Sequence, residues 1–194
     1  MTFALYCLKL VITGNPGVGK HTNAKIVAKK LDAEIIDINK IAISEDAIAE
    51  QTDHGAEVNI KKLTGLLSRK MKKDADYVIV GHLAPYVLKP EGIGMVAVLR
   101  RSPYDLEKTL EQRGYSRQKI NENVSSEILG ISLYDSIETF GKRKVAEFDT
   151  TGKKPGQTAD DIVATLEKKK RRHSGSVDWL AVISDEDVQR FFNY

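Results

Sequence analysis

The chain has 194 residues, of which 41% are hydrophobic, enough for one domain with a proper core, and its net charge of only +3 does not by itself indicate nucleic acid as a partner. The single cysteine, Cys7, excludes an internal disulfide and fits a reducing compartment. No apolar run approaches the roughly 20 residues of a membrane span, and the hydrophobic start lacks the basic segment of a signal peptide, so we expect a cytoplasmic protein without membrane contact.

The first predicted element is a strand over residues 8–13, which is followed by the glycine-rich segment 14–22 (GNPGVGKHT) and a helix over 24–31. Strand, glycine loop, lysine and helix stand in the order of a phosphate-binding loop. Glycines let successive backbone N–H groups turn toward a phosphate, and the helix start adds the positive end of its dipole. Lys20 supplies a full charge where the β and γ phosphates would lie. The segment therefore predicts nucleotide phosphate binding.

The residues after Lys20 differ from the usual pattern. Most such loops place Ser or Thr directly after the lysine as a magnesium ligand, whereas here His21 intervenes and Thr22 follows. Nucleoside monophosphate kinases that resemble adenylate kinase use the same Gly-Lys-x-Thr order after a Pro-Gly pair, here Pro16-Gly17. This favours a small-molecule kinase over a motor or a GTPase, with Thr22 as the candidate metal ligand. From its position alone, we interpret His21 as a solvent-facing residue of the first helical turn.

The rest of the chain alternates between predicted strands and helices. Short apolar runs predict strands over residues 33–38, 77–80, 95–99 and 144–150. Helical spacing of apolar residues predicts helices over 59–73 and 103–113, one long helix that carries Ile120 through Ile137, and a last helix capped by Thr158. Residues 41–63 show no strong period and include a predicted turn at 51–55. The pattern predicts a doubly wound α/β fold, with a five-stranded parallel sheet and helices on both faces.

Two strand ends carry candidate site residues. Gly81 and His82 follow the strand over 77–80, and Arg100-Arg101 follow the strand over 95–99. Open parallel sheets bind ligands at the carboxyl ends of their strands. Arginines near a phosphate loop favour phosphate contacts, so we expect Arg100 to offset charge on a transferred phosphoryl group. A lone loop histidine is more often structural, and position alone does not decide the role of His82.

Two polar segments flank the last predicted helices. Residues 112–122 form a polar hinge with Arg113, Arg117 and Lys119, suited to closing over a triphosphate and expelling water. Residues 168–172 are an unbroken basic run, and the tail after it contains too many apolar and aromatic groups for a disordered end. Either the tail docks on the core, or it is an extension that contacts RNA or protein.

Five segments, in their order and spacing, resemble a known family: GNPGVGKHT, GHLAPY, LRRSPY, EQRGYSRQKINENVSSEIL and TGKKP. They resemble the atypical adenylate kinases of small ribosomal subunit maturation, the coilin-interacting nuclear ATPase or adenylate kinase isoenzyme six group, and especially its archaeal members. The resemblance covers residues 8–170. It implies a P-loop kinase domain over 1–172, with a nucleoside monophosphate cap at about 37–60 and a short lid at about 112–122, followed by an extension over 173–194.

The same resemblance implies an activity and its participants. Members convert ATP and AMP to two ADP and also hydrolyse ATP, so ATP and Mg²⁺ are the implied cofactors and AMP the implied acceptor. A small-subunit ribosomal protein and pre-ribosomal RNA are the implied partners. Two alternatives stay open: an ATP-gated ribosome assembly factor with incidental kinase activity, or a kinase of another small acceptor such as a nucleoside or a shikimate-like alcohol.

Carried over position by position, the resemblance assigns site residues. The implied ATP phosphate ligands are Gly17, Gly19, Lys20, His21, Thr22 and Arg113, Lys154 would lie by the adenine, and His82 matches a family histidine. We group Lys20, Arg100, Arg113 and His82 as the catalytic set, which aligns the substrates and neutralises charge. The acidic residue that usually ends the third strand of the family is missing. Either a carboxylate such as Asp37 replaces it as the magnesium holder, or metal handling is weaker.

Overall fold

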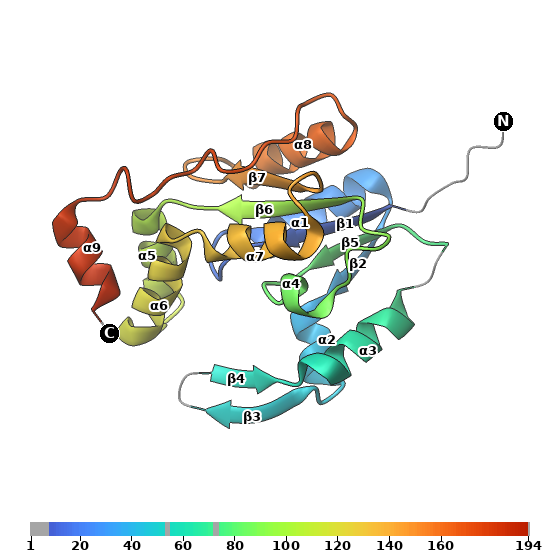
Figure 1. Cartoon of the computed structure of the whole chain (residues 1–194), viewed down its shortest axis with the longest axis horizontal. Helices are drawn as coiled ribbons and strands as arrows, with labels where there is room; N and C mark the ends of the chain where they lie inside the picture. The colour runs from blue at the N-terminus through green and yellow to red at the C-terminus, as the bar shows by residue number, and fades with distance from the viewer. Residues whose placement is uncertain (1–7, 53–54, 72–73, 194) are drawn as a thin grey trace.

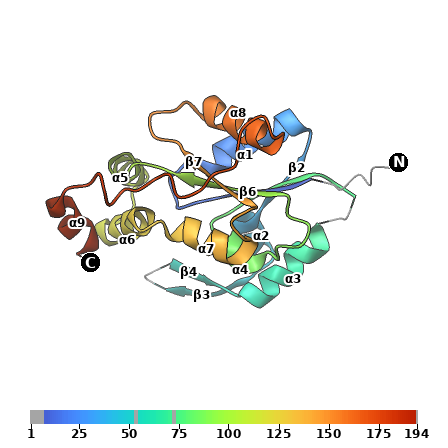
Figure 2. The ribbon, with the colours of Figure 1, turned by 45° about the horizontal axis from the view of Figure 1, so that its top comes forward.

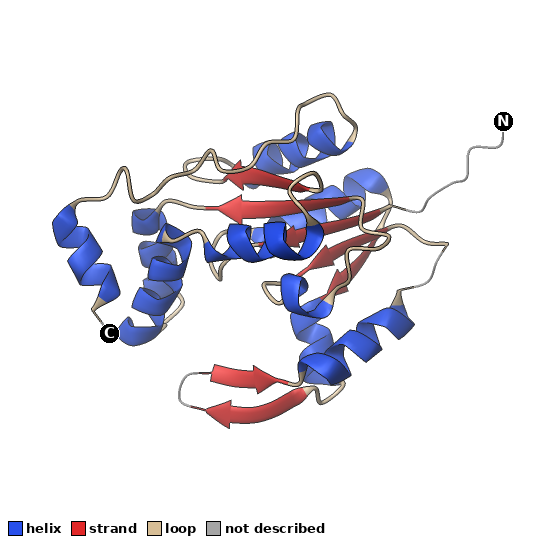
Figure 3. Ribbon diagram, in the orientation of Figure 1, coloured by secondary structure: helices blue, strands red, loops and turns tan. Residues whose placement is uncertain are grey.

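The computed structural model describes residues 8–52, 55–71 and 74–193 and is built on a central parallel sheet (Figure 3). The sheet has the strand order β2-β5-β1-β6-β7. Its strands are β1 (Lys9–Thr13), β2 (Glu34–Asp37), β5 (Tyr77–Val80), β6 (Met95–Arg100) and β7 (Val145–Asp149). Val11 in the central strand pairs with Ile79 on one side and Val96 on the other. The prediction of a five-stranded parallel sheet of P-loop type is confirmed.

Helices cover both faces of this sheet, as Figures 1 and 2 show. Helices α1 (Lys20–Leu31) and α8 (Pro155–Leu166) pack on one face, and α4 (Ala84–Val87) and α7 (Ile131–Phe140) on the other. Successive side chains of a strand point to opposite faces, so Leu10 and Ile12 belong to the first core cluster and Val11 to the second. Burial on both faces explains why these strands are continuous apolar runs rather than alternating ones.

A small cap lies beside the carboxyl end of β2 (Figure 1). It consists of α2 (Ile38–Ser44), an antiparallel hairpin of β3 (Ile48–Thr52) and β4 (Gly55–Val58), and the following α3 (Ile60–Lys70). The helix predicted over 59–73 corresponds to α3. At the hairpin only a turn was predicted, because the segments IAEQT and GAEV lack a strand-like alternation of apolar residues. That turn falls at the hairpin, although Asp53 and His54 lie outside the described residues.

The single long helix predicted through Ile137 is wrong. Helix α5 (Pro103–Gln112) is followed by α6 (Arg117–Ile128), and the chain then turns before α7 begins. Gly130 makes this turn with a φ of +68°, a left-handed conformation that glycine adopts without strain. A Cβ at this position would also lie 3.4 Å from the guanidinium of Arg100. The expected lid, at about 112–122, corresponds to the end of α5, the turn at 113–116 and the first half of α6.

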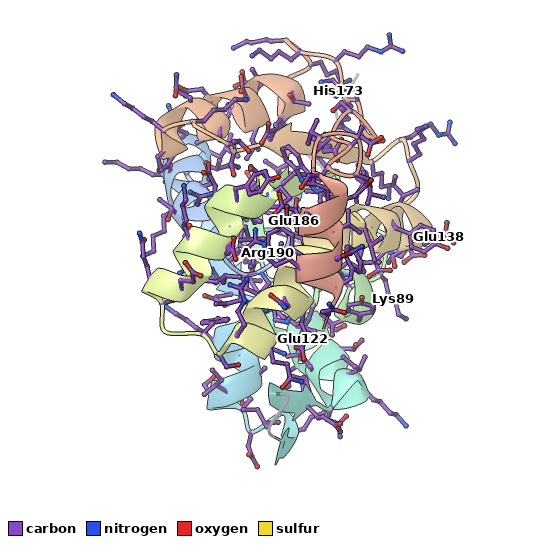
Figure 4. All side chains as sticks on the ribbon, turned by 90° about the vertical axis from the view of Figure 1, so that its left-hand side faces the viewer. Lys89, Glu122, Glu138, His173, Glu186 and Arg190 are labelled. Carbon is purple, nitrogen blue, oxygen red and sulfur yellow. The ribbon has the colours of Figure 1, made fainter. Side chains whose placement is uncertain are left out.

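The C-terminal tail docks on the domain, which confirms the first interpretation of the tail. Helix α9 (Asp185–Phe192) packs near α6, and Phe191 is completely buried. Figure 4 shows Arg190 on the side of α9 that faces α5, where its guanidinium lies 2.6 Å from Glu107.

The last domain helix, α8, begins at Pro155 with Lys154 as its N-cap, so the expected cap Thr158 is instead a buried residue of the first turns. In the part of the chain that the structure describes, no helix is long and apolar enough to cross a membrane.

Candidate active site

The loop between β1 and α1 has the backbone geometry that its glycines predicted. Gly17 and Gly19 have φ values of +91° and +90°, and a Cβ on Gly17 would lie 2.6 Å from the Leu106 side chain. Other residues are strained or excluded at such positions. The loop passes directly into α1, whose first residue is Lys20.

Lys20 is buried without a carboxylate partner among the contacts of the described residues. Its Nζ donates a hydrogen bond to the backbone carbonyl of Asn15 at 3.0 Å, and the side chain is 5% exposed. Burial and, to a smaller extent, the nearby charge of Arg113 lower the pKa of Lys20 to about 8, against the opposing charges of Asp37 and Glu127. A cation held in this way gains stabilisation from an anion placed next to it.

A cavity of about 230 Å³ opens at this loop, and we call it the phosphate cavity. It is lined by Pro16, Gly17, Gly19, Lys20, His21, Thr22, Asn39, His82, Arg113 and Tyr115. The fold thus brings together seven of the predicted site residues from the loop, the exit of β5 and the end of α5. Arg100 and Lys154 are the two that do not line the cavity.

His82 and Arg113 approach Lys20 from different elements. Burial lowers the pKa of His82 to about 4, and the charges of Lys20, His21 and Lys119 add to this effect. At neutral pH the imidazole of His82 is therefore uncharged, and it can donate or accept a hydrogen bond but not neutralise a phosphate. Arg113 ends α5 with an exposed side chain and supplies the second full charge of the phosphate cavity.

The position of Arg100 corrects the expectation that it contacts phosphates. The side chain is 2% exposed, and its guanidinium lies 2.6 Å from Glu127 and 2.8 Å from Glu147, with a third hydrogen bond of 2.6 Å to the Glu127 carbonyl. Two buried carboxylates already compensate its charge. The strand-end position predicted nearness to the loop correctly, but the two carboxylates come from distant segments whose approach the sequence pattern does not indicate.

The neighbouring Arg101 was named with Arg100 at the strand end but was not placed in the catalytic set, and it does contact the loop. Its guanidinium donates a hydrogen bond of 3.2 Å to the carbonyl of Gly17, and its buried Nε has no hydrogen-bond partner among the described residues. Asn39 and Tyr115 were also missed. Tyr115 lies two positions after Arg113, in the same segment that predicted Arg113 as a phosphate ligand, and it also lines the phosphate cavity.

The structure explains why no acidic residue follows β5. Val80 is buried, and a Cβ on Gly81 would lie 2.7 Å from the Cβ of Ile38. Asp37 ends the neighbouring strand β2 instead, where one carboxylate oxygen accepts hydrogen bonds from the first amides of α2. Its other oxygen lies 3.2 Å from Nε2 of His21, whose side chain is 46% exposed. Within the described residues, no group of three or more His, Cys, Asp or Glu side chains is arranged to hold a metal by itself.

Lys154 lies at the exposed N-cap of α8, after the loop that leaves β7. The hydroxyl of Thr150 in this loop donates hydrogen bonds to the carbonyls of Val18, at 3.2 Å, and of Arg100, at 2.9 Å. The loop is therefore attached to the back of the phosphate loop, although Lys154 itself does not line the phosphate cavity.

A second cleft, of about 550 Å³, adjoins the phosphate cavity, and we call it the acceptor cleft. The two spaces share Pro16, Asn39, His82 and Tyr115. Apolar side chains from the cap, α4 and α7 line it and remain partly exposed: Ile43, Ile60, Tyr86 and Ile131. Polar groups of α6 and α7 complete its wall, among them Lys119, Asn123 and Asp135.

Comparison with known proteins agrees with this arrangement. Residues 10–130 match the family model described as "AAA domain". The chain is 35% identical over 176 residues to a protein of Thermococcus gammatolerans, a match that covers 91% of this chain and 95% of that protein. It is 30% identical over 190 residues to one of Methanocaldococcus jannaschii, covering 96% and 97%. Both relatives carry the name "Putative adenylate kinase".

Solved structures with much lower identity share the fold. A gluconokinase from Sinorhizobium meliloti matches with a TM-score of 0.58 at 14% identity, covering 84% of this chain and 94% of that chain. A shikimate kinase from Bacteroides thetaiotaomicron matches with a TM-score of 0.56 at 16% identity, covering 83% and 98%. With its phosphate loop, its parallel sheet and these relatives, the chain has the P-loop kinase fold, and it belongs to the AAA-domain family and to the family of the proteins named "Putative adenylate kinase".

Proposed function

We propose that the protein is an adenylate kinase that transfers the γ-phosphoryl group of ATP to AMP. The observation that carries this proposal is the junction of two spaces: a small cationic cavity at the phosphate loop that opens into a larger, partly apolar cleft. Transfer between two substrates needs both at once, with the reacting atoms held in line. The archaeal relatives with the corresponding name support the same acceptor.

On the ATP side, the loop amides and two cations act on the phosphates. Lys20 and Arg113 offset the charge that spreads over the moving phosphoryl group, and the backbone N–H groups near Gly17 and Gly19 hold the chain of phosphates. His82 is neutral and sits where the two spaces meet, so it orients an oxygen by hydrogen bonding rather than by charge. Lys154 is proposed to lie by the adenine, beyond the phosphate cavity.

The acceptor cleft is suited to a nucleoside monophosphate. Apolar walls such as Ile43 and Tyr86 provide contact for a base, and Asn39 offers an amide whose buried carbonyl oxygen has no hydrogen-bond partner within the described part of the chain. Six residues from the expected monophosphate cap, at about 37–60, line one wall of this cleft: Asn39, Ala42, Ile43, Ile48, Val58 and Ile60. We propose that cap and lid close over the two substrates and exclude water, because water would otherwise compete as acceptor.

Magnesium fits the donors that are present. Mg²⁺ prefers oxygen ligands, keeps several waters and is usually held by substrate phosphates plus one or two protein groups. Thr22 lines the phosphate cavity and offers a hydroxyl. Asp37 lies 3.2 Å from Nε2 of His21, another lining residue, and is the carboxylate that we propose to hold the metal through water. The metal would add charge neutralisation and geometry at the phosphates.

A coupled assay across acceptors tests the proposal. With Mg-ATP, we expect rapid ADP formation with AMP, slower formation with other nucleoside monophosphates, and none with shikimate or gluconate. Turnover that is highest with one of these alcohols, or that does not depend on any added acceptor, would contradict an adenylate kinase. Calorimetric binding of Mg-ATP to the same preparation separates a wrong acceptor from an inactive protein.

Two further expectations rest on the family resemblance alone and stay predictions: ATP hydrolysis and a role in small ribosomal subunit maturation. A cytoplasmic location, expected from the composition, also stays a prediction. Stimulation of ATP consumption by a ribosomal protein or by RNA, in the absence of AMP, would favour the ATP-gated assembly factor. Strong dependence on AMP would favour the kinase.

A further inference from the structure

The C-terminal strap, residues 173–179, is bound to the domain by polar contacts rather than by apolar packing alone. It runs from the end of α8 past β7 toward α6, with His173 at its start (Figures 1 and 4). The amide of Glu147 in β7 donates to the carbonyl of His173 at 2.9 Å. The side chain of Glu147 in turn accepts hydrogen bonds from the amides of Ser176, at 2.8 Å, and Val177, at 3.2 Å. The strap thus satisfies a buried carboxylate.

The strap ends on a second buried carboxylate, that of Glu127 in α6. The indole N–H of Trp179 donates to Oε1 of Glu127 at 3.1 Å, and Nε of Arg100 donates to the same oxygen at 2.6 Å. The other oxygen of Glu127 accepts from the side-chain amide of Asn15 at 2.7 Å. Glu127, which is completely buried, therefore joins the strap to the phosphate loop.

Asn15 is fixed on both sides of its amide. Its Nδ2 is held by Glu127, and its Oδ1 accepts hydrogen bonds from Ser126, at 3.2 Å, and Ser132, at 3.3 Å. Its backbone carbonyl is the group that receives the hydrogen bond of Lys20. A displacement of Asn15 would consequently move the acceptor that positions the catalytic ammonium.

Arg100, Glu127 and Glu147 form a buried charge cluster, and their charges explain why the strap affects the phosphate loop. The described residues place one guanidinium, that of Arg100, against the two carboxylates of Glu127 and Glu147. The excess negative charge must be stabilised by neutral donors, because buried charge without compensation is costly. Trp179 and the strap amides are among those donors, and so is Asn15. Loss of the Trp179 donor therefore alters how tightly Glu127 holds Asn15.

We propose that the strap is a positioning element of the ATP site, acting through Trp179, Glu127 and Asn15 on the phosphate loop. The inference rests on the proposed ATP-dependent function but not on the identity of the acceptor. Coupling of this kind is reciprocal, so ATP bound at the loop must also stabilise the strap.

The test compares two variants that each remove one aromatic hydrogen-bond donor linking the tail to the domain. Trp179→Phe deletes the donor to Glu127, and Tyr104→Phe deletes the 2.7 Å hydrogen bond to Asp187 on α9, which does not touch the cluster. We expect Trp179→Phe to raise the calorimetric Kd for Mg-ATP about three- to tenfold, the scale of one net hydrogen bond, and Tyr104→Phe to leave it unchanged. Equal losses in both variants, or none in Trp179→Phe, would overturn the proposal.

A double-mutant cycle tests the route. In an Asn15→Ala background, Trp179→Phe should cause no further loss of ATP affinity, because the side chain through which it acts is gone. Independent, additive effects would show that Trp179 does not act through Asn15. In wild-type protein, ATP should slow hydrogen exchange at the amides of Ser176 and Val177, and unchanged exchange would contradict the coupling.

The measurements of ATP affinity and hydrogen exchange do not depend on which acceptor is phosphorylated. If the protein binds Mg-ATP but does not phosphorylate AMP, the adenylate kinase assignment fails, whereas the effect of Trp179→Phe on ATP affinity still decides the role of the strap. If AMP is phosphorylated at the parental ATP affinity in Trp179→Phe, the kinase stands and the positioning role is wrong.

Discussion

Lys20 and Arg100 are both buried beside the phosphate loop, yet only one of them is available to a substrate. Lys20 has a backbone carbonyl as its partner and faces a cavity, and burial lowers its pKa to about 8. Arg100 lies between two carboxylates and has no access to the cavity. A cation without a carboxylate partner is destabilised until an anion arrives, whereas a compensated one only holds the fold together. The comparison indicates that availability, not nearness, separates a charge that can act on a substrate from a structural one.

Removing the charge of Lys20, the cation that faces the cavity, should have the largest effect. Lys20→Met should lower ADP formation by about a thousandfold, the scale for a lost contact to transition-state charge. Because the buried ammonium costs desolvation in the folded state, the midpoint of thermal unfolding should not fall. Steady-state kinetics and calorimetric unfolding of the same preparation measure both quantities. A parental rate, or loss of the fold, would contradict the role of Lys20.

Removal of the compensated cation should have the opposite pattern. Arg100→Met leaves the carboxylates of Glu127 and Glu147 buried without their shared cation, and we expect about 3 kcal/mol less unfolding free energy. Molecules that remain folded should still phosphorylate AMP at a rate within about tenfold of the parent, because no substrate contact is lost. Denaturant unfolding and activity below the transition measure the two effects. If activity disappears while stability is retained, Arg100 does contact the phosphates after all.

Much of this arrangement could be predicted from the sequence, because it is encoded locally. The five apolar runs, the glycines of the loop and the residues next to Lys20 are signals within a few positions of one another, and the fold places them as expected. The phosphate cavity then follows from the rule that parallel strands end at one edge of the sheet. His82 reaches it for this reason, because it follows β5, whereas Arg113 comes to it from the end of α5.

The failures have a common physical cause: they concern contacts between distant segments. Whether Arg100 points to a phosphate or to a carboxylate depends on Glu127 and Glu147, which lie 27 and 47 positions away. The break between α6 and α7 depends on Gly130, whose left-handed turn makes room for the same guanidinium. The hairpin of the cap gives no local signal, because its strands IAEQT and GAEV show neither a continuous apolar run nor an alternation of apolar and polar residues.

The pH dependence of ATP affinity gives the smallest of these effects and isolates the ionisation of Lys20. A triphosphate favours the charged ammonium, so affinity should fall as pH rises through about 8, by about tenfold between pH 7 and pH 9. Lys20→Arg supplies the matched control, because a guanidinium stays charged over this range and should flatten the dependence. Calorimetric titrations of both proteins at the two pH values measure the difference.

The same ionisation should act on stability in the opposite direction. The pKa of Lys20 is about 8 in the folded protein and 10.5 in an unperturbed lysine, so between these values the unfolded chain binds more protons than the folded one. Stability therefore rises with pH across this window, while ATP affinity falls. If stability and ATP affinity both fall with rising pH in the parent, and fall equally in Lys20→Arg, then the titrating group is not Lys20. In that case the ammonium of Lys20 does not differ from the guanidinium of Arg100 in its availability to a substrate.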